Sequence, residues 1–159
     1  MVNATHGGGR PGRLRVLFDT SALVKRYSAE AGHEQVLAVF GRATELVVAA
    51  HSKTEMAAAL LRRRQDGSLS PDEYDRAWAM AQEDVADMEP VPLDAHVERF
   101  ALAAMEHGPL RAQDALHVGS ALAARVDLFV TADRRQAQAA RQMGLDTECV
   151  VPAEMKEAA

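Results

Sequence analysis

LRVLFDTSAL, residues 14–23, is the most informative stretch of the chain, because a short apolar, β-prone run leads directly into an acidic residue, Asp19. The same arrangement returns in LFVTADRR, residues 128–135, where Asp133 follows the apolar run. Apolar runs of this length, bounded by turn and helix formers, predict buried strands. Since open parallel sheets bind ligands beyond the carboxyl ends of their strands, both carboxylates are expected at one functional edge.

The rest of the chain alternates between strand and helix patterns. Further strands are predicted at 46–49, 91–93 and 147–150. Helices are predicted from Ser21 through Tyr27, over 32–42, 52–64, 71–87, 111–125 and 134–143, and from a cap at Asp94 to a break at His107. Ser70, Pro71 and Glu73 supply a helix start, and Gly144 supplies a stop. This alternation predicts the α/β class, with a central, mostly parallel sheet and helices on both faces.

The length of 159 residues suits one domain, which we predict over 14–151, after a Gly-rich, disordered leader at 1–13 and before a tail at 152–159. No apolar run approaches a membrane span, and no signal core is visible. Cys149 is the single cysteine, so a cytoplasmic location is expected. The net charge of −5 argues against a large non-specific nucleic-acid surface. The three arginines at 62–64 are equally consistent with a solvated helix face and with phosphate contacts.

Two further acidic residues lie on predicted helices with apolar neighbours: Glu55 precedes a nearly continuous apolar run, and Asp114 belongs to a helix with a core-facing side. A desolvated carboxylate is costly unless something positive stabilises it. Mg²⁺ or Mn²⁺ is the usual partner of clustered carboxylates, since hard cations prefer oxygen ligands. We call Asp19, Glu55, Asp114 and Asp133 the acidic quartet, and they predict a small metal-dependent hydrolase, specifically a nuclease.

These carboxylates also have purely structural explanations. Asp19 could cap a helix or form a turn, although its place after an apolar strand favours a function, and Ser21 is the expected cap of the first helix. Asp133 with Gln136 three residues later resembles a capping box, so the structural and functional explanations are balanced there. Glu55 lies in the first turn of its helix, where the dipole favours a carboxylate.

His117 lies three residues after Asp114, so the two side chains share one face of a helix. A simple hydrogen bond between them is favoured over metal ligation by the histidine. Zinc is disfavoured, because cysteine ligands and closely spaced histidine pairs are missing. A nucleophilic enzyme built on Ser21 or Ser120 has little support, since the chain has no Gly-x-Ser-x-Gly elbow.

Four segments resemble the motifs of PIN domains in their order along the chain: FDTSALVKRY, the Glu-bearing helix before LLRRR, LRAQDALHVGSAL and FVTADRR. The chain is most similar to the single-domain ribonuclease toxins of bacterial VapC type, over about 14–151. The resemblance implies a PIN-like three-layer α/β/α domain. It also implies a Mg²⁺- or Mn²⁺-dependent endoribonuclease that cleaves RNA to a 5′-phosphate and a 3′-hydroxyl, is held inactive by a cognate antitoxin, and forms a homodimer.

The resemblance also implies roles for particular residues. The acidic quartet would bind the metal and carry the catalysis, with Ser21 ordering Asp19 or a metal-bound water. Thr131 and His117 match positions that are frequently polar in the family, and would have supporting roles. Leu23 and Val24 are candidates for an exposed apolar surface that binds an antitoxin tail, whereas Leu37 and Phe40 are expected in the core.

Two other classes of function stay open. The first is a PIN fold that binds RNA or a partner without turnover, and the complete acidic quartet counts against it. The second is a Mg²⁺-dependent phosphatase or receiver-like α/β domain, in which the Asp after the first strand is phosphorylated or holds Mg²⁺. A receiver needs a lysine after a late strand, where this chain has Thr131, Ala132 and Asp133.

Overall fold

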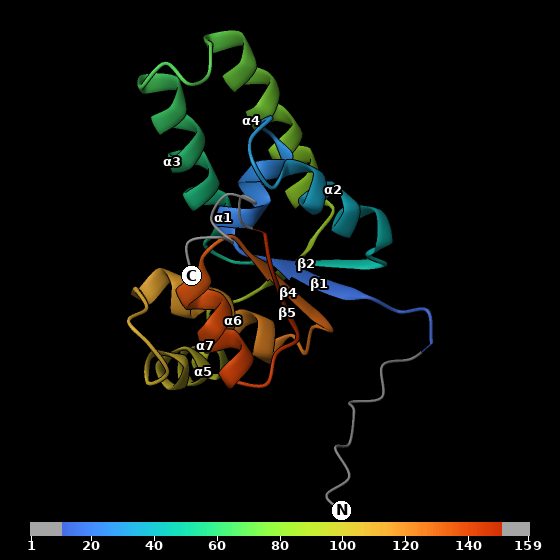
Figure 1. Ribbon diagram of the computed structural model, residues 1–159, viewed down its shortest axis with the longest axis vertical. Helices are drawn as coiled ribbons and strands as arrows, with labels where there is room; N and C mark the ends of the chain where they lie inside the picture. Colours follow the sequence, from blue (N-terminus) through green and yellow to red (C-terminus); the bar gives the residue numbers. More distant parts are fainter. Residues whose placement is uncertain (1–10, 151–159) are drawn as a thin grey trace, which may run out of the picture.

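The computed structural model describes residues 11–150 (Figure 1). The predicted tail at 152–159, and the predicted leader up to residue 10, lie outside the described residues. Within the described part the chain alternates strands and helices, and no helix there is long and apolar enough to cross a membrane.

One sheet of five parallel strands forms the centre of the described part, and it confirms the predicted α/β class. The strands are β1 (Arg15–Phe18), β2 (Glu45–Ala49), β3 (Glu89–Val91), β4 (Leu128–Thr131) and β5 (Thr147–Cys149). Their spatial order is β3-β2-β1-β4-β5. The chain runs outward from β1 to β3, then crosses to the other side of β1 at β4 and continues to β5, so the switch point lies between the neighbouring strands β1 and β4. Ligand sites of open α/β sheets lie at this switch point. The prediction of a strand at 91–93 was displaced by two residues, since β3 ends at Val91.

Two layers of helix enclose the sheet. The helices are α1 (Thr20–Leu23), α2 (His33–Arg42), α3 (Ser52–Gln65), α4 (Pro71–Ala86), α5 (Ala95–Met105), α6 (Ala112–Ala123) and α7 (Arg134–Gln142), with a 3₁₀ turn, η1 (Val24–Arg26). Figure 1 shows α1 to α4 on one side of the sheet and α5 to α7 on the other. The predicted capping box at Ser70 and Glu73 is confirmed at the start of α4, and Gly144 takes the left-handed conformation after α7.

The alternation of side chains along β1 connects the sheet to both helical layers. Val16 and Phe18 belong to the core shared with α1 to α4, whereas Leu17 belongs to the core shared with α5 to α7. All three are at most 1% exposed. Because both faces of β1 are buried, the strand and the Asp19 that follows it are held firmly in place.

Helix α6, which carries Asp114 and His117, packs closely on α5. A Cβ atom at Gly119 would lie 2.5 Å from the carbonyl oxygen of Val97 and 3.0 Å from the amide nitrogen of Ala101. Only glycine allows the two backbones to approach to this distance. The depth at which α6 enters the protein is therefore set by this contact.

The short first helix differs from the sequence prediction in two ways. Its N-cap is Asp19 rather than Ser21, because the Asp19 carboxylate accepts a hydrogen bond from the amide of Ala22. Leu23 and Val24 are 1% and 4% exposed, so the prediction of an exposed antitoxin-binding surface there was wrong: α1 and η1 fold these side chains back onto the sheet.

The prediction of a core position for Phe40 is confirmed. Its ring stacks on Phe18, with the ring centroids 4.6 Å apart, and packs against the same core as α1 to α4. Leu37 is half-buried on the same helix.

Candidate functional site

Asp19 occupies the carboxyl end of β1, directly beside the end of β4. Its amide donates to the carbonyl of Val130 at 2.9 Å, and its carboxylate accepts from the amide of Ala22 and from the hydroxyl of Ser21, at 2.8 Å and 2.9 Å to its two oxygens. The residue is 3% exposed. The predicted role of Ser21 in orienting Asp19 is therefore consistent with these two hydrogen bonds. The Asp19 side chain both caps α1 and lies at the switch point.

Burial makes a charge at this position expensive. Desolvation is the largest influence and raises the pKa of Asp19 to about 6, against lowering contributions from the charge of His117 and from the hydrogen bonds of Ser21 and Ala22. The charge of Asp114 adds to the upward shift. A carboxylate whose pKa is raised in this way is stabilised in its ionised form when a cation binds beside it.

Asp114 lies in the first turn of α6. One of its carboxylate oxygens accepts a hydrogen bond at 3.2 Å from Nε of Arg111, whose side chain is largely exposed. The predicted hydrogen bond between Asp114 and His117 was wrong. His117 instead turns toward α3, and the ion pair with Arg111 takes its place at Asp114.

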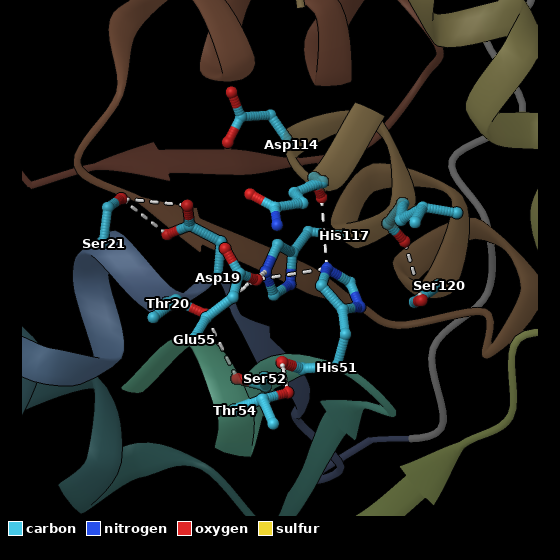
Figure 2. A network of polar contacts seen from close by, with 12 residues as sticks. Asp19, Thr20, Ser21, His51, Ser52, Thr54, Glu55, Asp114, His117 and Ser120 are labelled. Atoms are coloured by element: carbon cyan, nitrogen blue, oxygen red, sulfur yellow. Dashed lines mark hydrogen bonds and ion pairs between the residues drawn. The ribbon is translucent and has the colours of Figure 1, made fainter. Parts of the chain in front are cut away.

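His117 and Glu55 form a close polar contact. Nε2 of His117, which is 1% exposed, lies 2.6 Å from Oε1 of Glu55. The hydroxyl of Thr20 lies 3.2 Å from the same histidine nitrogen and 3.3 Å from the same carboxylate oxygen. Nε2 of His51, which directly precedes α3, reaches Oε1 of Glu55 at 3.1 Å. Figure 2 shows these side chains converging from α1, α3 and α6.

The electrostatics of this group keep Glu55 ionised. Burial on its own raises the pKa of Glu55, but the hydrogen bond from His117 and the charges of both histidines outweigh it, so the pKa lies below its usual range. Burial, together with repulsion from His117, lowers the pKa of His51. Glu55 is thus an anion among hydrogen-bond donors.

Asp133 caps α7. Its Oδ1 accepts hydrogen bonds from the amides of Arg135 and Gln136, at 2.8 Å and 3.2 Å. The predicted capping box is wrong in its second half, because the side chain of Gln136 does not return to the cap. It accepts from the Thr131 hydroxyl at 2.6 Å and donates to the carbonyl of Asp114 at 2.9 Å.

Thr131 connects the two halves of the switch point. Its hydroxyl accepts a hydrogen bond from the amide of Asp133 at 3.0 Å and lies 3.4 Å from the hydroxyl of Ser21. Ser21 in turn accepts from the amide of Ala132 at 3.0 Å. The ends of β1 and β4 are therefore joined through two hydroxyl groups, and Asp19 and Asp133 are held on either side of them.

Sequence reasoning missed three polar residues of the site, His51, Thr20 and Gln136. His51 lies four residues before Glu55, a spacing that places both on one helix face and that could have revealed the pair. Thr20 and Gln136 gave no such signal, because their contacts are to residues of other elements. Gln136 is fully buried, and its position became visible only in the packed fold.

A pocket of about 330 Å³ opens beside Glu55. It is lined by His51, Thr54, Glu55, Ala58, Arg62, Arg111, Gln113 and Leu116. Arg62 and Arg111 add positive charge to this lining, Glu55 adds an acidic group, and Ala58 and Leu116 add apolar surface. An anionic ligand with a flat apolar part would find partners for both.

The region offers two kinds of metal donor. Among residues 11–150, one group of three side chains brings ligand atoms within 4.8 Å of one another, and it consists of His51, Glu55 and His117. The carboxylates of Asp19 and Asp114 add oxygen donors nearby, and Figure 2 shows Asp19 across the His117 ring from His51 and Asp114 above them. A hard cation suits the aspartates, and a borderline cation suits the imidazoles.

Comparison of the structure with solved proteins finds the same fold in other chains. PAE2754 from Pyrobaculum aerophilum has a TM-score of 0.58 and 16% identity, covering 94% of this chain and 92% of its own. VapC20 from Mycobacterium tuberculosis, described as a toxin that cleaves the sarcin-ricin loop, has a TM-score of 0.57 and 13% identity, covering 76% and 92%. VapBC-5 from the same organism, of the VapBC family of toxin-antitoxin systems, has a TM-score of 0.55 and 18% identity, covering 86% of this chain and 98% of its own.

No curated protein matches the chain in sequence. At these identities the solved structures show the fold alone. The sequence itself matches the PIN domain family over residues 16–142, which include the whole acidic quartet, strands β2 to β4 and all of β1 except Arg15. That match spans well over half of the chain and confirms the resemblance found in the motifs: the chain belongs to the PIN domain family.

Proposed function

We propose that this protein is a metal-dependent endoribonuclease that hydrolyses RNA phosphodiester bonds at the switch point of its sheet. The observation that carries the proposal is the buried carboxylate of Asp19, with its raised pKa and with the charge of Asp114 close by. A fold gains nothing in stability from a desolvated carboxylate next to a second one. Such an arrangement is understandable where a cation is part of the working protein.

The donors at this edge fit Mg²⁺ or Mn²⁺. Asp19 and Asp114 would hold the ion, with Asp133 supplying a further carboxylate across the switch point, and all of these donors are oxygen atoms, as hard cations prefer. When bound, the ion would lower the pKa of a water and polarise the scissile phosphate. Ser21 would keep the Asp19 carboxylate oriented, through the two hydrogen bonds described above.

Glu55 would accept the proton of the attacking water. Its contacts with His117, His51 and Thr20 among the described residues all go to Oε1, so Oε2 is the oxygen available for this transfer. Its lowered pKa keeps it ionised, as a proton acceptor must be. His117 and Thr20 thus act as positioning residues that hold the base in one orientation.

The neighbouring pocket would receive the RNA. Arg62 and Arg111 can contact backbone phosphates, and the apolar side chains of the lining can contact a base that is unstacked from its neighbours. Cleavage would leave a 5′-phosphate and a 3′-hydroxyl. The negative overall charge favours a local, shaped contact over broad phosphate binding.

The biological setting that fits best is a toxin-antitoxin pair. VapC20 is described as a toxin that cleaves the sarcin-ricin loop, and VapBC-5 as a member of a toxin-antitoxin family. We propose that this chain is likewise a toxin held inactive by a cognate antitoxin, and that it forms a homodimer. Co-purification of a tagged chain with the product of a neighbouring small gene would test the partner, and sedimentation would test the dimer.

The test of the enzyme is cleavage of a mixed RNA pool by purified protein free of antitoxin, with Mg²⁺ or Mn²⁺ and with EDTA. Wild type should cut only with metal, Asp19→Asn should not cut, and the exposed-surface control Asp75→Asn should cut like wild type. EDTA-insensitive cutting, or full cutting by Asp19→Asn, would sink the proposal. No cutting by folded wild-type protein would favour an RNA- or partner-binding PIN domain without turnover.

The receiver-like alternative does not fit the fold. Receiver domains have the strand order 2-1-3-4-5, whereas this sheet has the order 3-2-1-4-5. The loop after β4 also contains Asp133 in the region where a receiver needs its lysine. Beryllium fluoride, which binds the acceptor aspartate of a receiver and mimics its phosphorylated form, should therefore not bind.

A further inference from the structure

Two histidines that are far apart in the sequence meet over Glu55. Nε2 of His51 and Nε2 of His117 lie 3.1 Å and 2.6 Å from the same carboxylate oxygen, and the two rings are 4.2 Å apart. His51 precedes the first residue of α3, and His117 belongs to α6 on the opposite side of the sheet. The expectation that histidine pairs were missing considered only spacing in the sequence, and folding supplies the pair.

These three side chains have the composition of an open zinc site. Two imidazole nitrogens and one carboxylate oxygen, with a fourth position left to water or substrate, are typical of catalytic zinc centres. Bonds of about 2.0–2.1 Å in a tetrahedral site place neighbouring ligand atoms about 3.3 Å apart. The observed separations of 2.6 Å and 3.1 Å from Oε1 need to widen by less than 1 Å.

Hydrogen bonding alone does not account for the arrangement. Nδ1 of His51 and Nδ1 of His117 are both buried and have no hydrogen-bond partner in the described part of the chain. If Nε2 of each ring is protonated, it donates to Glu55, and Nε2 of His51 also lies 3.2 Å from the carbonyl oxygen of Gln113; each Nδ1 is then left as an unpaired acceptor. If the protons lie on Nδ1 instead, two nitrogen lone pairs face the same anionic oxygen, which is repulsive unless a cation lies between them. A cation bound to both Nε2 atoms removes this repulsion, and the remaining proton of each ring then lies on Nδ1.

We propose that His51, Glu55 and His117 form a second metal site, selective for a borderline transition metal such as Zn²⁺ over Mg²⁺. The selectivity follows from the imidazole ligands, which suit Zn²⁺ and not Mg²⁺. The pocket beside Glu55 is lined by His51 and gives the ion a path of entry and room for its fourth ligand.

The site shares Glu55 with the proposed nuclease centre, and its functional consequence rests on that proposal. Zn²⁺ held by the two histidines and Oε1 would draw negative charge from the Glu55 carboxylate, so that Oε2 becomes a weaker proton acceptor. Zn²⁺ is therefore an inhibitor of Mg²⁺-dependent cleavage, and the inhibition depends on His51, which has no other part in the nuclease centre than its contact with Glu55.

The direct test is metal binding, with no RNA present. Co²⁺, as a spectroscopic stand-in for Zn²⁺, is titrated into wild type, His51→Ala and His107→Ala in excess Mg²⁺, and Zn²⁺ affinity is then measured by displacement. Wild type and His107→Ala, whose histidine is exposed at the end of α5, should show the intense visible absorption of tetrahedral Co²⁺. His51→Ala should bind Zn²⁺ at least about tenfold more weakly, since loss of even an outer partner typically costs 10–100-fold.

Equal Zn²⁺ affinity in wild type and His51→Ala would overturn the site, as would weak octahedral Co²⁺ absorption in wild type. The His51 side chain makes no hydrogen bond that caps α3, so the variant should fold, and circular dichroism checks this. His51→Gln, which keeps a polar side chain, is the second variant and should lose Zn²⁺ binding equally.

A further variant separates the two proposals. Asp19→Asn should bind Zn²⁺ as wild type does while losing Mg²⁺-dependent cleavage. Zn²⁺ binding that depends on His51, in a protein that never cleaves RNA, would support this site and refute the nuclease. Where cleavage is present, added Zn²⁺ should reduce the rate of wild type by a larger factor than the rate of His51→Ala; equal factors would refute the link through Glu55.

Discussion

Replacing Asp19 with asparagine should stabilise the protein in the absence of divalent metal, although it should abolish the proposed activity. Asparagine keeps an acceptor oxygen for the amide of Ala22 and the hydroxyl of Ser21, so the start of α1 stays intact. What disappears is the buried negative charge. The expected gain in stability therefore measures the energetic cost of that charge in the metal-free fold.

The size and the pH dependence of the gain follow from the pKa of Asp19, which burial raises from 3.8 to about 6. That is a difference of about 2 pH units, or about 3 kcal/mol at 1.36 kcal/mol per unit. Between these two pKa values the folded protein binds a proton that the unfolded chain does not, so stability falls as the pH rises. Above pH 6 wild type carries the whole penalty, and below pH 4 it carries none.

Urea unfolding in EDTA at several pH values measures the difference directly. Asp19→Asn should be more stable than wild type by about 2–3 kcal/mol at pH 8, and the difference should vanish near pH 4. Asp75→Asn, at an exposed position, should follow wild type within about 0.5 kcal/mol at every pH. Added Mg²⁺ should stabilise wild type and leave Asp19→Asn unchanged. An asparagine variant that is less stable than wild type at pH 8 would refute the reasoning.

Four further substitutions test other parts of the structure. Glu55→Gln should slow single-turnover RNA cleavage by about 100-fold or more, because loss of a general base typically costs 10²–10⁴-fold; a loss below about tenfold would contradict that role. Gly119→Ala should cost about 1–3 kcal/mol in urea unfolding, since its Cβ would lie 2.5 Å from the carbonyl of Val97. Gly41→Ala, in an open helical position, should instead stabilise by about 0.5–1 kcal/mol. Ser70→Ala should lose about 1 kcal/mol with its capping box, and an unchanged midpoint would show that α4 does not need the cap.

The features that could be predicted from the sequence are those that depend on residues close together in the chain. The strand before Asp19, the cap and first-turn proline of α4, and the glycine stop after α7 each depend on neighbouring residues. The order of apolar strands and amphipathic helices was enough for the α/β class. Even the position of Asp19 at the functional edge follows from its place after a buried strand.

The features that could not be predicted depend on contacts between distant elements. His117 was assigned to Asp114 because only its own helix was visible, whereas the fold brings Glu55 of α3 within 2.6 Å of it. Leu23 and Val24 were predicted to be exposed, because a helix as short as α1 has too few residues for its apolar pattern to indicate which face is buried. In both cases the partner is distant in the sequence, and local patterns carry no information about it.

Helix α6 is the element on which both proposed sites depend. Asp114 and His117 lie three residues apart on it, yet the first turns toward Arg111 and Asp19, and the second toward Glu55 and α3. A small rotation or outward shift of α6 would move both side chains together. The absence of a side chain at Gly119 lets α6 pack this closely on α5, so the positions of both side chains relative to Asp19 and Glu55 depend on that packing. A change at Gly119 should therefore weaken Mg²⁺-dependent cleavage and Zn²⁺ binding in parallel, whereas a change at His51 should affect Zn²⁺ binding far more than the affinity for Mg²⁺.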